Sequence, residues 1–407
     1  MNLQELEHEL SSLTVFGELD HNEVFSAFRT MLFMLEHKDA LSKASSFAWQ
    51  LYQKYTDNWT GYLCDLVLYL ETPCSYFAGI GKPIPTYIEQ AARHDLSILS
   101  EAAGVTPELV AYCMGQEESY IPGWKAYSVD LESLYFDRLS EIGKHGFGLY
   151  AKSKMFHMEL SNANRNGFVL EPVRYPDTVQ LSDLIGYERQ RTQVIENTRA
   201  LLAGQKAANV LLYGDAGTGK SATVKAVANA YADEGLRLIE LTKEELHLLP
   251  KLLDELAANP LKFILFIDDL SFQDNDDNFS ALKAVLEGSI SARSHNTVIY
   301  ATSNRRHIVR ETFSQRAGDE IHRNDTMQET ISLSERFGIR ILYDKPNKQL
   351  YLDIVKGLAD QYGLSMTEDE LELEAERFAT RRSGRSARAA RQFVEQLCAA
   401  KSTKNKE

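Results

Sequence analysis

A glycine-rich stretch at residues 209–229, NVLLYGDAGTGKSATVKAVAN, holds the residues best suited to chemistry. Its spacing fits G-x-x-x-x-G-K-[ST], the Walker A pattern, with Gly214, Gly219, Lys220 and Ser221 at the defining positions. Glycines let backbone N–H groups turn toward an anion, and the helix that follows adds the positive end of its dipole. The stretch therefore predicts a cradle for the phosphates of a nucleotide.

Two side chains in this loop have distinct expected roles. Lys220 is predicted to reach the β- and γ-phosphates of ATP, and the Ser221 hydroxyl is predicted to bind Mg²⁺. The alternative is a glycine turn that only joins a strand to a helix, but the apolar run 210–213 and the helical spacing afterwards favour the phosphate site. The expected nucleotide-binding residues of the loop are Gly214, Asp215, Ala216, Gly217, Thr218, Gly219, Lys220, Ser221 and Ala222.

A second group of chemical residues closes the segment KFILFIDDL, residues 262–270. It places two carboxylates at the end of an apolar strand, where a charge is costly unless a cation meets it. We expect Asp268 to bind Mg²⁺ directly or to hydrogen-bond to one of its ligands. We expect Asp269 to orient and polarise the attacking water. The alternative is a strand end that turns into solvent. The DNDD run at 274–277 lacks the glycine and the terminal glutamate of an EF-hand, so we expect a solvated loop there.

Length and composition limit the class of protein. With 407 residues the chain predicts two or three domains, and its net charge of −14 argues against non-specific nucleic-acid binding by the whole surface. The four cysteines and ten histidines show no metal-ligand spacing, and no secretory signal precedes them. No apolar run is long enough to span a bilayer. We expect a cytoplasmic protein with reduced thiols, no membrane segment and no structural metal.

The first part of the chain, 1–142, has helical spacing of its apolar residues and predicts a mainly helical domain. The aromatics of residues 51–63, LYQKYTDNWTGYL, either pack helices together or form a binding surface; packing is the favoured interpretation. Residues 143–177 predict a connector with a β-hairpin, because strand-like runs flank Asn166-Gly167. Its first residues, GKHGFG, contain too much glycine for an expected helix.

Strand-like and helix-like segments then alternate through residues 178–345, which predicts an α/β domain with a parallel sheet covered by helices on both faces. The expected strands are NVLLYG, LRLIEL, KFILFID, TVIYATS and IRILYD, with helical segments between them that include 242–259 and a long stretch at 305–338. Residues 346–401 predict a helical lid of three helices, near 347–362, 367–382 and 386–400. A polar tail at 402–407 follows.

Six segments carry a resemblance to a known superfamily: DLIGYERQ, LLYGDAGTGKS, FILFIDDLSF, VIYATSNRRH, ISLSERFG and GRSARAARQF. From about residue 178 to 400 the chain resembles an AAA+ ATPase, a P-loop NTPase. Its sequence is similar to that of a bacterial group of AAA+ proteins known as domain-of-unknown-function family 815. The resemblance implies binding and hydrolysis of Mg·ATP, an oligomer, and Asp268-Asp269 as the Walker B carboxylates. It does not extend to the first 140 residues.

The resemblance also implies roles for further residues. Asn304 resembles the sensor-1 residue that binds the γ-phosphate or the water, and Ile185 and Gly186 resemble the segment that lines the adenine pocket. Arg336 resembles the arginine finger that reaches the ATP of a neighbouring subunit; a surface salt bridge with Glu335 is the alternative. Arg388 resembles the sensor-2 arginine of the lid, with Arg391 as its rival one turn further along the helix.

Two departures from the superfamily narrow the expected function. The acidic pair is Asp-Asp where many AAA+ enzymes have Asp-Glu, which predicts slower turnover. The segment after LRLIEL has no aromatic–glycine pore loop, which argues against an unfoldase. The leading hypothesis is an ATPase that remodels an unknown protein partner bound by the N-terminal domain. The alternatives are a slow ATP-switched binding module and a nucleic-acid-associated loader, the latter supported only by the arginines between 381 and 391.

Overall fold

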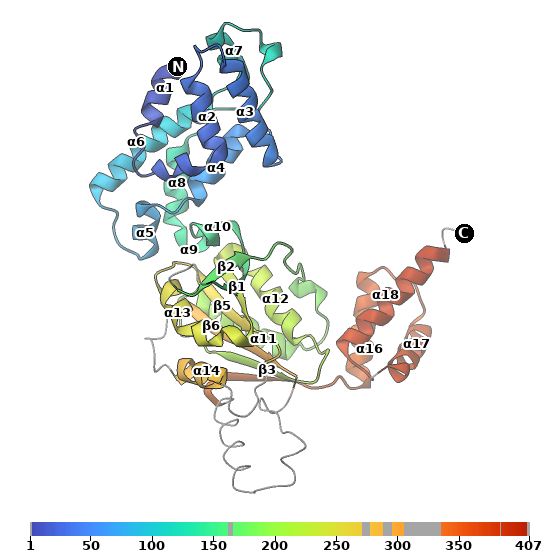
Figure 1. The fold of residues 1–407 in the computed structure, drawn as a ribbon. Helices are drawn as coiled ribbons and strands as arrows, with labels where there is room; N and C mark the ends of the chain where they lie inside the picture. The colour runs from blue at the N-terminus through green and yellow to red at the C-terminus, as the bar shows by residue number, and fades with distance from the viewer. Residues whose placement is uncertain are drawn as a thin grey trace. The chain divides into compact units, whose positions relative to one another are not determined.

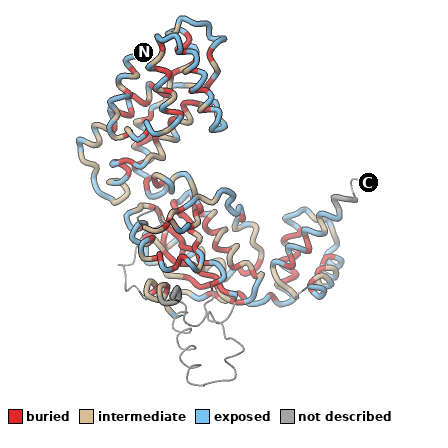
Figure 2. Tube along the Cα trace, in the orientation of Figure 1, coloured by how far each residue is buried: buried red, intermediate tan, exposed pale blue. Residues whose placement is uncertain are grey.

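The computed structural model divides the chain into two compact units, residues 1–152 and 153–407. It describes residues 2–161, 166–270, 277–287, 295–304, 335–382 and 384–404 (Figure 1). Each unit has buried residues at its centre and exposed residues around them (Figure 2). The finer domain limits expected from the sequence stay predictions. The structural expectations for residues 271–276, 305–334 and 405–407 also stay predictions, because these residues lie outside the described part of the chain.

The first unit is built from helices and their connections. Several of its helices begin where a side chain accepts a hydrogen bond from the first turn, as Asn22, Asn58, Thr72 and Thr106 do. The α-helices are α1 (Leu3–Leu10), α2 (Glu23–Phe33), α3 (Ala40–Gln53), α4 (Trp59–Tyr69), α5 (Pro73–Gly79), α6 (Thr86–Ala103), α7 (Pro107–Met114), α8 (Leu131–Ser140), α9 (Ile142–His145) and α10 (Leu149–Lys152); the 3-10 helices are η1 (Gly17–His21) and η2 (Glu118–Tyr120).

Aromatic rings fill the centre of this unit. The Trp59 ring stacks on Phe28 with their centroids 4.4 Å apart, and its indole Nε1 donates to Ala102 O at 2.9 Å. The burial of the aromatic side chains varies along the segment 51–63. Trp59 is fully buried, as helix packing requires, whereas Tyr55 is 99% exposed and Tyr52 43% exposed.

The glycine-rich stretch at 143–148 differs from expectation. One helical turn, α9, includes Gly143, and the chain leaves it at Gly146 and Gly148, which have φ of 66° and 61°. Glycine accepts this left-handed backbone at little cost, so the stretch supports a short helix and the turn that ends it.

The second unit contains a seven-stranded sheet in the order β2-β1-β4-β5-β6-β3-β7. The five strands expected in the α/β domain all form and run parallel, which confirms the α/β fold class. The hairpin strands β1 and β2 pair antiparallel, and β1 pairs in parallel with β4, so the hairpin extends the same sheet. The strands are β1 (Met155–Leu160), β2 (Phe168–Pro172), β3 (Val210–Gly214), β4 (Leu236–Leu241), β5 (Lys262–Ile267), β6 (Thr297–Ser303) and β7 (Ile339–Tyr343).

Both faces of the sheet are covered. Successive strand residues point to opposite faces, and every residue from Phe263 to Ile267 is at most 1% exposed. On one face Val194 of α11 (Glu188–Leu202) and Val224 of α12 (Lys220–Ala230) join Ile264 in one apolar cluster. Helix α13 (Leu249–Ala257) contacts β6, and α14 (Asp277–Glu287) contacts α13. Short 3-10 turns are η3 (Leu181–Asp183) and η4 (Ala232–Glu234).

One expected helix begins later than the sequence pattern suggested. Residues Lys243–Leu248 form a 3-10 segment, η5, before α13 starts at Leu249. Pro250 explains the difference, because proline is accommodated in the first turn of an α-helix and disrupts its interior.

Three lid helices follow the sheet, as expected: α16 (Lys348–Gln361), α17 (Glu368–Arg381) and α18 (Ala387–Lys404). Tyr351 of α16 donates to Ala375 O of α17 at 3.0 Å, and burial raises the pKa of its phenol to about 12. None of the helices in the described part of the chain has the length and apolar composition that a membrane crossing requires.

A buried carboxylate fixes the start of the first unit. Asp95 of α6 is 1% exposed, and its Oδ2 accepts from the backbone N–H groups of Thr14, Val15 and Phe16 at 2.9, 2.8 and 3.1 Å. These bonds tie the turn after α1 to α6.

We predict that Asp95→Ala lowers the free energy of unfolding of this unit by about 2–4 kcal/mol, because three N–H groups lose their charged acceptor. Tryptophan fluorescence during urea unfolding of the full chain measures this, since the three tryptophans, Trp49, Trp59 and Trp124, all lie in the first unit. Asp95→Asn keeps an acceptor oxygen and is the control. Equal stability of Asp95→Ala and the wild type would contradict the prediction.

Candidate nucleotide-binding site

A cavity of about 540 Å³ lies at the carboxyl ends of β3, β5 and β6. This is where ligands bind in open parallel sheets, beside strands whose order in the sheet departs from their order in the chain. It brings together four of the sequence segments predicted to form a site, together with the lid. The expected residues that line it are Ile185, Gly186, Ala216, Gly217, Thr218, Gly219, Lys220, Ser221, Ala222, Asp268, Asp269, Asn304 and Arg388.

Lys220 lies at the start of α12 and is 5% exposed. Its Nζ donates to Asp215 O at 2.7 Å, to Asn304 Oδ1 at 3.1 Å and to Gly214 O at 3.4 Å. Burial lowers the pKa of this ammonium, and the carboxylates of Asp215 and Asp269 oppose that shift. Within the described part of the chain the hydrogen bonds of this buried cation go to neutral oxygens, which it is well placed to exchange for the anionic oxygens of a phosphate.

The first glycine of the loop, Gly214, is required by a close contact. Gly214 has φ 128°, and a Cβ there would lie 2.3 Å from Tyr343 O of β7. Gly214 and Asp215 lie behind the cavity wall, where Asp215 N donates to Tyr343 O and Asp215 Oδ2 accepts from Lys345 N at 2.9 Å. Asp215 thus ties the loop to the strand that leads into the lid.

Ser221 and Asp268 are adjacent, as a magnesium site requires. The Ser221 hydroxyl donates to Asp268 Oδ1 at 2.6 Å, which leaves the lone pairs of the hydroxyl for a cation. Mg²⁺ binds oxygen ligands and uses few carboxylates when phosphates and water complete its shell. Ser221 and Asp268 supply oxygen ligands of this kind, a donor set that fits Mg²⁺ carried with a nucleotide.

Asp269 and Asn304 face each other across the ends of β5 and β6. Asn304 Nδ2 donates to Asp269 Oδ1 at 2.8 Å, while its Oδ1 accepts from Lys220. Asp269 has φ 51°, a left-handed backbone that aspartate tolerates better than most residues. The sheet thus links lysine, amide and carboxylate in one chain of hydrogen bonds.

Ile185 and Gly186, the residues expected to lie near adenine, pack against helix α16 of the lid. Gly186 has φ 78°, and a Cβ there would lie 3.0 Å from Leu350 and 3.1 Å from Ile354 of α16. The Ile185 side chain packs at the position of Gly357 on the same helix. This apolar region suits the flat face of a base.

Two arginines of α18 line the cavity. Arg388 N donates to Gly217 O at 3.0 Å, so the first turn of α18 contacts the phosphate loop itself. Arg391 lines the same cavity, and the choice between the two as a phosphate sensor stays open.

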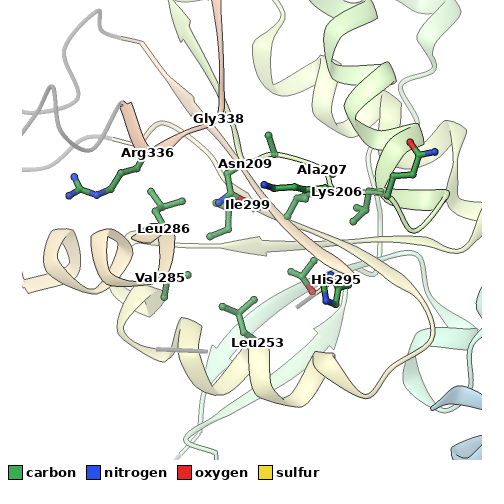
Figure 3. Close-up of a pocket in the computed structure, with 15 residues that line it drawn as sticks. Lys206, Ala207, Asn209, Leu253, Val285, Leu286, His295, Ile299, Arg336 and Gly338 are labelled. Atoms are coloured by element: carbon green, nitrogen blue, oxygen red, sulfur yellow. Dashed lines mark hydrogen bonds between the residues drawn. The ribbon is translucent and has the colours of Figure 1, made fainter. Parts of the chain in front are cut away.

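Arg336 lies near the amino ends of the strands, whereas Lys220 lies near their carboxyl ends. Arg336 lines a separate cavity of about 810 Å³ with Asn209, Thr297 and Gly338, which stand at the amino ends of β3, β6 and β7. Figure 3 shows Arg336 beside Leu286 of α14. The strands between the two cavities are five or more residues long. At roughly 3.3 Å per residue they separate Arg336 from the cavity that holds Lys220.

Several residues of the site have roles that the sequence did not predict. Tyr187 has φ 57°, stacks on Tyr343 with centroids 5.1 Å apart, and donates to Asp344 O at 2.7 Å. Burial raises the pKa of Tyr343 to about 12, so both rings act as neutral packing surfaces. Arg191 also lines the cavity, and Thr302 binds both carboxylate residues of β5. Tyr187 and Thr302 lie inside the quoted segments DLIGYERQ and VIYATSNRRH, but the sequence predicted no role for either of them or for Arg191.

Comparison with protein families identifies the second unit. The family described as "Protein of unknown function (DUF815)" matches residues 153–401, more than half of the chain. The chain belongs to this family. The match begins where the second unit begins and ends at the close of the lid, so it covers every residue of the cavity described above.

Solved structures give a weaker likeness. The RuvB Holliday junction branch migration motor of Thermotoga maritima is 17% identical, with a TM-score of 0.36, over 53% of this chain and 63% of that chain. Two single-substitution variants of RuvB from the same organism are 17% and 16% identical, each with a TM-score of 0.35. This chain therefore spans less than two thirds of these structures. No curated protein matches it.

We predict that Lys220→Ala weakens ATP binding at least about 100-fold, because charged hydrogen bonds to the phosphates are lost. Titration with a fluorescent ATP analogue measures the affinity. Lys225→Ala is the matched control: Lys225 lies on the same helix, pairs with Glu240 at 3.6 Å and is outside the cavity, so its loss should leave the affinity unchanged. Near-wild-type affinity of Lys220→Ala would show that the phosphates bind elsewhere.

Proposed function

We propose that this protein is a Mg·ATP-dependent ATPase of the AAA+ type whose nucleotide cycle moves the lid against the sheet and remodels a bound protein partner. The observation that supports it is the convergence of Lys220, Ser221, Asp268 and Asn304 in one cavity that also touches Arg388 of the lid. Residues 1–142 are the proposed partner-binding region.

ATP would bind with its phosphates against residues 216–222 and the N-terminus of α12, where backbone N–H groups and Lys220 meet the negative charge. The base would lie against Ile185 and Gly186. Mg²⁺ would supply positive charge at the β- and γ-phosphates, with Ser221 and Asp268 as its protein side.

Hydrolysis requires a group that orients the attacking water. Asp269 is the proposed residue, because its carboxylate stands beside Asn304 at the phosphate end of the cavity. Its hydrogen bond to Asn304, which also accepts from Lys220, holds the carboxylate before ATP binds. When Lys220 and Asn304 bind phosphate, the Asp269 carboxylate would lose its hydrogen bond to Asn304 and become available to water.

Contact between α18 and the phosphate loop supports the coupling of nucleotide to lid movement. Arg388 N donates to Gly217 O, and Arg388 and Arg391 both face the cavity. A γ-phosphate would attract either guanidinium and draw α18 toward the loop. Loss of that phosphate would weaken this attraction.

A slow ATP-switched module is the second candidate. It is favoured by Asp269, whose side chain is one methylene shorter than the glutamate found in many AAA+ enzymes, and by its bond to Asn304. Turnover without a partner would then be low, while ATP-dependent binding of the partner would persist.

Nucleic-acid binding has less support. Arg385 is paired with Glu376 through bonds of 2.9 and 2.6 Å, Arg382 lies over the Phe378 ring, and Arg388 and Arg391 face the cavity. Of the arginines between 381 and 391, most therefore have partners or a place in the nucleotide site.

We predict that Asp269→Asn retains ATP affinity within about threefold and loses most hydrolysis, because the amide cannot accept the proton of water. Phosphate release and nucleotide titration measure the two properties separately. Asp268→Asn is the comparison, since loss of its charge should weaken Mg²⁺-dependent binding as well. Full hydrolysis by Asp269→Asn would move the water-orienting role to another residue.

An assembly prediction follows from Arg336. Arg336 stands near the amino ends of the strands and Lys220 near their carboxyl ends, so Arg336 would complete the nucleotide site of a neighbouring subunit in a homo-oligomer. Arg336→Ala should bind ATP and lose about 10³-fold or more of its hydrolysis, as for other arginine fingers. The control Arg340→Ala, an exposed residue of β7, should retain activity.

Mixing Arg336→Ala with Lys220→Ala tests this shared site directly. In mixed oligomers an intact phosphate loop can face an intact Arg336, so part of the activity should return although each variant alone is inactive. Wild-type hydrolysis per subunit should also rise with protein concentration. Absence of recovery in oligomers that contain both variants would contradict the shared site.

A further inference from the structure

Thr302 is a buried polar residue of the segment VIYATSNRRH for which the sequence predicted no role. It lies in β6, pairs with Leu212 of the phosphate-loop strand and is 2% exposed. Its Oγ1 donates to Asp268 Oδ1 at 2.5 Å and accepts from Asp269 N at 2.9 Å. One hydroxyl therefore holds both carboxylate residues at the end of β5.

The direction of these bonds is fixed by chemistry. The amide of Asp269 can only donate, so it uses an acceptor lone pair of the Thr302 hydroxyl. The single hydroxyl proton then goes to Asp268. Thr302 O also accepts from Leu270 N at 2.7 Å, so the same residue holds the chain on both sides of Asp269, whose backbone is left-handed.

Asp268 depends on this arrangement for its orientation. From the described residues, Oδ1 receives the Ser221 hydroxyl at 2.6 Å, the Thr302 hydroxyl and, at 3.1 Å, the Asp269 amide. These bonds select one rotation of the carboxylate and aim Oδ1 at Ser221. They therefore also orient the Ser221 hydroxyl, whose proton points to Asp268 and whose lone pairs face away from it.

We propose that Thr302 is a positioning residue that preorganises the Mg²⁺ side of the nucleotide site by fixing Asp268 and the backbone of Asp269. This inference rests on the proposed function, because it concerns the cation that accompanies ATP. Partners that orient a metal's ligands typically change metal affinity or activity by about 10- to 100-fold when removed. Thr302 does not touch the phosphates and is not itself a catalytic residue.

Thr302→Val tests the proposal because valine keeps the shape and the branching of the side chain and removes only the hydroxyl function. ATP affinity in EDTA should match the wild type, since the phosphate loop and Lys220 are unaltered. The Mn²⁺ affinity of the ATP complex, measured by electron paramagnetic resonance of the ion, should fall about 10-fold or more. The Mg²⁺ concentration for half-maximal hydrolysis should rise by a similar factor.

Thr302→Ser returns the hydroxyl and should restore Mn²⁺ affinity to within about threefold of the wild type. The pair Thr302→Ser and Thr302→Ala differs by one oxygen and gives the same comparison if the valine variant does not fold. A purely structural role would lower ATP affinity in EDTA and the unfolding temperature together, without a selective effect on the cation.

The outcomes separate the inference from the function on which it rests. Wild-type protein that binds no ATP, or binds it equally after Lys220→Ala, would overturn the proposed function. Wild-type protein that binds Mn²⁺·ATP, with unchanged cation affinity in both Thr302→Val and Thr302→Ala, would overturn only the positioning role of Thr302. Loss of cation affinity in those variants, restored by serine, would support it.

Discussion

The site depends on the cost of burying the positive charge of Lys220 beside the ends of parallel strands. Lys220 is 5% exposed, whereas Asp268 and Asp269 are exposed residues just beyond the buried strand β5. A buried ammonium is tolerated only when hydrogen bonds or opposite charge meet it. Asn304 meets part of that need by linking Lys220 to Asp269, and Thr302 binds both aspartates. A phosphate and a cation could take over these interactions with little rearrangement.

The order of the strands makes this possible. β3 lies between β6 and β7, so the phosphate loop is bordered by Asn304 at the end of β6 and by Tyr343 at the end of β7. Tyr343 accepts from the loop and leads through Lys345 into the lid, while α18 returns to contact Gly217. The loop is therefore held by the strand before the lid and by the last helix of the lid, and in the proposed function these contacts would couple nucleotide binding to the position of the lid.

The two units differ in what they reveal about function. The second unit carries the family match and every residue of the cavity. The first unit is helical, with an aromatic core around Trp59 and with exposed aromatics such as Tyr55 and Trp49 on its surface. Exposed aromatics are compatible with the proposed partner-binding role of this unit. They do not identify the partner, because aromatic residues serve both helix packing and recognition.

Local patterns in the sequence determined the elements and the loop. Periodicity predicted the strands and lid helices, and the spacing of Gly214 to Ser221 predicted the phosphate site, because both depend on neighbouring residues along the chain. Tertiary structure alone decided that the hairpin joins the sheet at β4, that Thr302 binds Asp268 and Asp269, and that Arg336 stands at the far edge from Lys220. Strand order and register set these relations, and they bring together residues more than thirty positions apart whose pairing no local pattern encodes.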